Sequence, residues 1–208
     1  MGFEIIVIGT SLGGLDALNL LLSGLPKSLP VSVAVVQHRY KSSDNMLSGF
    51  LQQHSLLPVV EAQDKEAMAP GRVYLAPADY HLLVEAGSFA LSTEAPVCHA
   101  RPSIDVLFES AADDYAENVI GVILTGASFD GAKGLAKIKA RGGLAIVQEP
   151  ATAISRIMPE AAIAELMSMS PCERAEENKG DVSSGAVNWI MPLEDIAPLL
   201  VKLSVANC

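Results

Sequence analysis

Apolar positions along this chain occur in two alternating kinds of segment. Short runs that are almost wholly apolar and rich in β-branched residues predict buried strands. These runs occupy residues 4–8, 31–36, 119–124 and 144–147. Segments with apolar residues three or four positions apart predict helices at 15–22, 44–53, 131–140, 159–167 and 193–203. Because apolar strands joined by helices are typical of a parallel sheet covered on both faces, the pattern predicts a doubly wound, mostly parallel α/β fold.

The middle of the chain interrupts this alternation. Three short segments, 72–76, 80–85 and 88–93, predict strands that no helical segment separates. The last two are joined by Ala86-Gly87, which predicts an antiparallel hairpin with a tight turn. We expect this hairpin to be an excursion at the edge of the sheet. Since no repeat, low-complexity stretch or charge run marks a linker, residues 1–208 are predicted to form a single domain.

Composition and charge narrow the classes of partner. The formal net charge is −10, which argues against binding to nucleic acid or to an anionic membrane surface. No apolar run approaches the roughly 20 residues of a membrane span, so membrane insertion is not expected. Cys98, Cys172 and Cys208 are scattered, which fits neither a disulfide framework nor a zinc site. These features together predict a cytoplasmic protein.

Three chemically useful residues follow three of the predicted strands. Ser11 comes after the first strand, His38 after the second, and Asp130 in the loop after 119–124. The carboxyl ends of parallel strands meet at one edge of a sheet, where ligands bind. A serine nucleophile, a histidine base and an orienting aspartate are the groups that acyl transfer requires. Ser11 also has the glycine-flanked setting, between a strand and a helix, of an exposed nucleophile.

Each of these residues also has an ordinary explanation. Ser11 and Asp130 can cap helices, and His38 can be structural. A glycine-rich turn between a strand and a helix can also hold phosphate, which would make this a nucleotide-binding protein. Ser11, however, stands where a dinucleotide-binding turn has its second glycine, and Leu15 stands where a Walker A motif has lysine. The coincidence at three strand ends therefore favours a hydrolase. The adjacent Cys98-His99 pair lacks metal-site spacing and predicts a surface or packing role.

Beyond single motifs, the chain resembles the CheB family of chemotaxis methylesterases from residue 5 to about residue 200. Many segments carry the resemblance in the family's order, which makes it far more specific than any one of them. They are I-G-T-S-L-G-G (8–14), V-V-Q-H (35–38), R-V-Y-L-A-P-A-D-Y-H (72–81), R-P-S-I-D-V-L-F-E-S-A-A (101–112), L-T-G-A-S-F-D-G-A-K-G (124–134), Q-E-P-A-T-A (148–153) and M-P-E-A-A-I (158–163).

The resemblance implies an enzyme that hydrolyses glutamate methyl esters on the cytoplasmic region of chemoreceptors and releases methanol. Family members also deamidate particular glutamines. The family's catalytic serine, histidine and aspartate map onto Ser11, His38 and Asp130. No metal or organic cofactor is implied, and backbone amides at Leu12 and Ala127 are expected to supply the oxyanion hole.

Arg101-Pro102-Ser103 is a family motif, and there are two hypotheses for the role of Arg101. Arg101 is expected either to reach an acidic substrate segment or to form a structural ion pair. Pro102 suits the first turn of a helix that carries Ile104 inward.

The chain departs from the family pattern in three ways. Leu12 stands where threonine is usual, and Ala127-Ser128-Phe129 stand where methionine, glycine and asparagine are usual. The usual N-terminal receiver domain is missing, which predicts either an excised domain or a stand-alone protein regulated in another way. Because both substitutions border the predicted site, the alternative to an esterase is a catalytically impaired binding or regulatory module that uses the same cleft.

Overall fold

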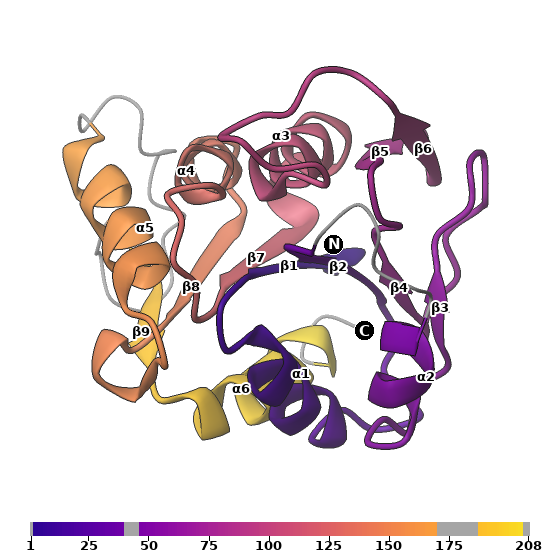
Figure 1. The fold of residues 1–208 in the computed structure, drawn as a ribbon. Helices are drawn as coiled ribbons and strands as arrows, with labels where there is room; N and C mark the ends of the chain where they lie inside the picture. The colour runs from indigo at the N-terminus through magenta and orange to yellow at the C-terminus, as the bar shows by residue number, and fades with distance from the viewer. Residues whose placement is uncertain (1, 40–45, 170–186, 206–208) are drawn as a thin grey trace.

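A sheet of seven parallel strands runs through the middle of the molecule (Figure 1), in a computed structural model that describes residues 2–39, 46–169 and 187–205. Within these residues the strand order is β3-β4-β2-β1-β7-β8-β9. The strands are β1 (Ile5–Thr10), β2 (Ser32–Gln37), β3 (Val59–Glu61), β4 (Val73–Leu75), β7 (Val119–Ile123), β8 (Leu144–Gln148) and β9 (Trp189–Met191). The doubly wound α/β fold predicted from the sequence is confirmed, and the segment at 72–76 is an internal strand of the sheet.

Helices cover both faces of this sheet. In Figure 1, α3, α4 and α5 lie on one face and α1, α2 and α6 on the other. Their bounds are α1 (Gly14–Ser23), α2 (Met46–Gln52), α3 (Ile104–Tyr115), α4 (Ala132–Ala140), α5 (Ile157–Ser168) and α6 (Leu193–Val205), with 3₁₀ turns at Ala116–Asn118 and Pro150–Thr152. None of the described helices combines the length and apolar character needed to cross a membrane.

The central strand β1 shows how the sequence specifies these two layers. Successive side chains of a strand point to opposite faces. Ile5 and Val7 are therefore packed in the core under α3 and α4, whereas Ile6 and Ile8 are packed in the core under α1 and α6. All four are fully buried, which explains why the strand reads as an unbroken apolar run.

The predicted hairpin is a separate two-stranded antiparallel sheet made of β5 (His81–Glu85) and β6 (Ser88–Ser92). Its turn, Ala86-Gly87, has positive φ at both positions, as a tight hairpin turn requires. The hairpin lies beside α3, where the Val84 amide donates to the Ser110 hydroxyl at 3.0 Å. The excursion therefore supports the helix that starts at the predicted site.

The element boundaries differ from the sequence predictions at β3 and at the start of α3. Strand β3 was not predicted, because it is only three residues long and Pro58 immediately precedes it. Pro102 was expected inside a helical turn, but α3 begins at Ile104 with Ser103 as its N-cap, so Pro102 precedes the cap. Serine is the better cap, since its hydroxyl accepts from the Val106 amide at 3.5 Å. Asp44, the first residue of the helix predicted at 44–53, lies outside the described residues, as do Cys172 and Cys208.

Candidate active site

The ends of β1, β2 and β7 bring Ser11, His38 and Asp130 to the same edge of the sheet. Thr10 and Gln37 are partners in the β1–β2 register, so Ser11 and His38 leave the sheet side by side. The His38 amide donates to the Thr10 carbonyl at 3.1 Å. On its other side β1 pairs with β7, the strand that precedes the loop carrying Asp130. The convergence expected from the strand ends is therefore present.

His38 and Asp130 form a direct pair. His38 Nε2 lies 2.7 Å from Asp130 Oδ2, and the aspartate side chain is fully buried. Because Asp130 occupies Nε2, Nδ1 is the ring nitrogen left to accept a proton from a nucleophile. Ser11 and His38 line one cavity of about 610 Å³. Among the described residues no hydrogen bond joins the Ser11 hydroxyl to His38, a contact that often forms only when substrate is bound.

Gln37 fixes the backbone on both sides of this pair. Its side-chain amide donates to the carbonyls of Ser11 and His38, each at 2.9 Å. The nucleophile candidate and the base candidate are thus held by one side chain from the end of β2. The sequence offered Gln37 only as the neighbour of His38, so this role was not anticipated.

Asp130 is held as an anion by four donors. Burial raises the pKa of Asp130, but hydrogen bonds from His38, from the amides of Ile104 and Asp105 and from the Ser103 hydroxyl outweigh it and hold the pKa below its ordinary value. The three donors other than His38 lie 2.7, 3.1 and 2.8 Å away. A buried carboxylate held in this way is prepared to stabilise a positive charge that develops on the imidazole.

Backbone amides around Ser11 are of two kinds. The amides of Ser11 and Gly126 donate to backbone carbonyls at 3.0 and 3.1 Å, so they are already engaged. The amides of Leu12 and Ala127 donate to no acceptor in the part of the chain that the structure describes. Gly126 also approaches the nucleophile candidate closely, since a Cβ at that position would lie 3.0 Å from Ser11 Cβ. Of the two amides predicted for an oxyanion hole, that of Leu12 directly follows Ser11 and that of Ala127 directly follows Gly126, and both remain unengaged among the described residues.

Several apolar side chains near the candidate site are exposed, among them Leu12 and Phe129, which depart from the family pattern. Leu12 lines the cavity and is 57% exposed, whereas Ala127 is exposed outside it. Phe129 is 72% exposed and Ile154 is 65% exposed. Exposed apolar side chains of this kind are suited to contact with a protein surface.

Two arginines line the cavity and differ in how their donors are used. Arg101 donates to Asp79 Oδ1 from Nε and Nη2, at 3.0 and 2.6 Å, and to the carbonyls of Thr93 and Glu94 from Nη1. Of its two predicted roles, the structural ion pair is thus present. Arg39, which the sequence analysis did not single out, donates from Nη2 to Glu61 and a backbone carbonyl. Its Nε and Nη1 have no hydrogen-bond partner among the described residues.

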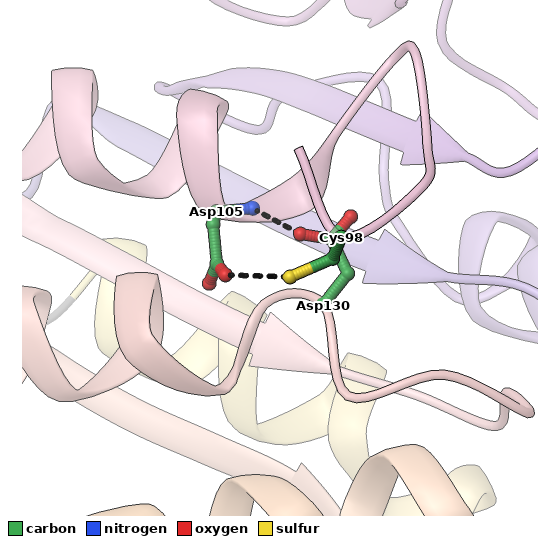
Figure 2. A group of neighbouring side chains, drawn as sticks. All are labelled: Cys98, Asp105 and Asp130. Atoms are coloured by element: carbon green, nitrogen blue, oxygen red, sulfur yellow. Dashed lines mark hydrogen bonds between the residues drawn. The ribbon is translucent and has the colours of Figure 1, made fainter. Parts of the chain in front are cut away.

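One group of metal-ligand type side chains lies next to the pair. In Figure 2, Cys98, Asp105 and Asp130 point toward one another, and one ligand-type atom from each lies within 4.8 Å of the others. Each carboxylate already accepts hydrogen bonds from backbone amides. The group is therefore organised by internal hydrogen bonds, which a metal ion would have to displace.

Known proteins resemble this chain over most of its length. The CheB methylesterase family matches residues 6–177. A Leptospira interrogans protein is 40% identical over 208 residues, covering 100% of this chain and 98% of the relative. The protein-glutamate methylesterase/protein-glutamine glutaminase 2 of Anaeromyxobacter dehalogenans is 39% identical over 97% of this chain and 53% of its own. The crystal structure of the Thermotoga maritima CheB methylesterase catalytic domain superposes with a TM-score of 0.84 at 33% identity, covering 98% of this chain and 100% of that one.

Proposed function

This chain belongs to the CheB methylesterase family, and we propose that it is a serine hydrolase that removes methyl esters from glutamate side chains of proteins and releases methanol. The observation that carries the proposal is the hydrogen-bonded His38–Asp130 pair, with a distance of 2.7 Å and a buried aspartate. His38 follows the end of β2, next to the end of β1 that Ser11 follows. The names of the Anaeromyxobacter and Thermotoga relatives support the same reaction.

In this mechanism the Ser11 hydroxyl attacks the ester carbonyl while its proton passes to His38 Nδ1. The resulting oxyanion accepts hydrogen bonds from the amides of Leu12 and Ala127. Collapse of the tetrahedral intermediate breaks the bond to the methoxy group, which leaves as methanol with the proton from His38. Water, deprotonated by His38, then attacks the acyl group, and Ser11 is regenerated as the glutamate carboxylate departs.

Asp130 contributes by its charge and its position. Hydrogen bonds hold its pKa below the ordinary value, so it stays ionised at neutral pH and stabilises the imidazolium formed in each transition state. In related triads the loss of this aspartate lowers kcat by about 10⁴-fold, and removing one oxyanion donor costs about 10²–10³-fold.

We further propose that the substrate is the cytoplasmic region of a methyl-accepting chemoreceptor, met by this chain in the cytoplasm. The exposed apolar side chains of Leu12, Phe129 and Ile154 support a protein substrate over a small molecule. Deamidation of glutamine would proceed through the same acyl-Ser11, with ammonia as the leaving group. The double name of the Anaeromyxobacter relative supports this second reaction.

The decisive experiment measures methanol release from a methylated receptor fragment by the wild type and by Ser11→Ala. We expect release by the wild type and none above background by the variant. Ser23→Ala, the same change at the exposed far end of α1, is the matched control and should retain wild-type release. A serine-reactive fluorophosphonate should label Ser11. A folded wild type that neither releases methanol nor accepts the label would instead support a binding or regulatory module.

A further inference from the structure

The triad candidate is attached to a second carboxylate, Asp105, through two helix starts. Asp130, in the loop before α4, accepts hydrogen bonds from the amides of Ile104 and Asp105 at the start of α3. Asp105 caps α4 in the same way, because its Oδ1 accepts hydrogen bonds from the amides of Gly131 and Gly134 at the start of α4, at 2.9 and 2.8 Å. The first turn of each helix is thus capped by a carboxylate from the other side of the interface.

Figure 2 shows a direct link between Asp105 and Asp130. The Asp105 amide donates to Asp130 at 3.1 Å, so the two residues are linked directly. Asp105 is only 3% exposed. Its second oxygen, Oδ2, accepts from the Cys98 thiol at 3.9 Å. Every described bond to the Asp105 carboxylate therefore comes from an uncharged donor.

The Asp105 charge is poorly accommodated in this position. Burial raises the pKa of Asp105, the hydrogen bond from the Gly134 amide lowers it, and the charges of Asp130 and Glu109 raise it. A bond from the Gly131 amide lowers it again, and the net result is a pKa of about 6. A carboxyl whose pKa is raised in the folded state stabilises the fold at low pH and loses that contribution as pH rises through 6.

An uncharged side chain would cap α4 without this penalty. The oxygen of an asparagine amide accepts the same two backbone hydrogen bonds. The carboxylate makes stronger hydrogen bonds, because the acceptor is charged. Those bonds hold the turn that immediately follows Asp130. A second anion close to Asp130 also increases the negative potential felt by His38 when its ring becomes positively charged.

We propose that Asp105 is a positioning residue of this esterase, whose carboxylate fixes the turn that carries Asp130 and keeps Asp130 aligned with His38. The inference rests on the proposed function, because it assigns Asp105 a part in that reaction. Asp105 touches neither substrate nor reacting atoms in this role, and acts through Asp130.

The pH dependence of the reaction gives the first test. The charged groups that act on Asp105 are Asp130 from the α4 side and Glu109 from α3 itself. Its hydrogen-bond partner Cys98, from the turn at 97–100, is in turn influenced by Lys133 of α4. As pH falls through about 6, protonation of Asp105 weakens its hold on the turn. Since the base must also be unprotonated, log kcat/KM of the wild type should fall with a slope steeper than one. Asp105→Asn should fall with a slope of one.

The second test separates positioning from folding. At pH 7.5 we expect Asp105→Asn to lose about ten- to hundredfold in kcat, with KM within about twofold and no fall in melting temperature. Asp113→Asn is the matched control, because it removes the same charge from an exposed ion pair further along α3. It should keep the wild-type kcat. A loss of kcat in Asp105→Asn that only follows a loss of folded protein would overturn the proposal.

A third readout needs no substrate, so it separates this inference from the proposed function. The His38 Nε2 proton bonded to Asp130 gives a low-field NMR resonance, which we expect to weaken and exchange faster in Asp105→Asn. A wild type without methanol release would contradict the esterase, yet the resonance would still report on alignment. An unchanged resonance in the folded variant would overturn the role of Asp105. Should the variant fail to fold, a wild-type acid slope of one would overturn it instead.

Discussion

The start of α1 and the paired starts of α3 and α4 lie at the same edge of the sheet, yet their backbone donors are used in opposite ways. Helix α1 has Gly13 as its N-cap, with φ at 80° and no side-chain cap. The amides of Leu12 and Gly13 donate to no acceptor among the described residues. At α3 and α4, by contrast, the carboxylates of Asp130 and Asp105 fill the open amides of both helices.

This difference separates two electrostatic tasks. Charge that exists only in a transition state requires donors that are unoccupied beforehand, and the start of α1 offers them beside Ser11. Charge that must be present throughout requires donors that are permanently engaged, as they are around Asp130. The amides at the start of α1 thus serve the reaction because no acceptor occupies them. The amides at the starts of α3 and α4 serve it because carboxylates already occupy them.

Asp130→Asn should disrupt the carboxylate cap at the start of α3 and have the largest effect. An asparagine NH₂ group cannot accept from the Ile104 amide or from His38, so at least one donor is left facing another donor. We expect kcat to fall by about 10⁴-fold. The free energy of unfolding should fall by about 2–3 kcal/mol at pH 7. Methanol release and urea unfolding measure the two effects.

The pH dependence of that destabilisation has a definite sign. Because the folded-state pKa of Asp130 lies below its ordinary value, its contribution to stability is present at neutral pH. It is lost as pH falls below the ordinary carboxyl range. The stability difference between the wild type and Asp130→Asn should therefore shrink toward pH 3, and a difference that grows there would contradict the assignment.

Gly13→Ala should disturb the uncapped start of α1, with a smaller effect. The positive φ is strained for alanine, and the new Cβ would lie 2.7 Å from Ile154 Cβ. The amides at 12 and 13 must then shift, which we expect to lower kcat by about 10²-fold. The control is Gly49→Ala in α2, where the new Cβ meets no atom within 4 Å. Kinetics unchanged by Gly13→Ala would mean that the Leu12 amide does not serve the oxyanion.

Asp105→Asn should change the stability of the capped helix starts in a pH-dependent way. The raised pKa of about 6 means that the ionised Asp105 destabilises the fold above pH 6. At pH 7.5 the variant should be more stable than the wild type by about 1–3 kcal/mol, and the gain should disappear near pH 4. Asp113→Asn should behave in the opposite way, because the Lys137 hydrogen bond lowers the pKa of that exposed carboxyl. Urea titrations at both pH values measure the change.

The sequence predicted the part of this site that depends on strand ends, and missed the part that depends on loops packing together. Ser11, His38 and Asp130 each follow a recognisable apolar strand, so one topological rule brings them to one edge. Asp105 looks like an ordinary acidic residue in the first turn of a helix, and nothing in the sequence says that it caps α4. The sequence analysis singled out Arg101 and not Arg39. In the structure, loop carbonyls occupy donors of Arg101, whereas Arg39 keeps two unpartnered donor atoms among the described residues. A sequence pattern does not reveal such loop contacts.

Cys98→Ala should have the smallest effect and tests what anchors Asp105. Burial and the charges of Asp130 and Asp105 raise the pKa of the Cys98 thiol, so it stays protonated at neutral pH and donates weakly to Asp105. Since the Gly131 and Gly134 amides remain, we expect kcat to change by less than about twofold. Iodoacetamide should alkylate Cys98 slowly, as mass spectrometry of its peptide would report. A loss of kcat as large as that of Asp105→Asn would mean that the thiol, and not the start of α4, fixes Asp105.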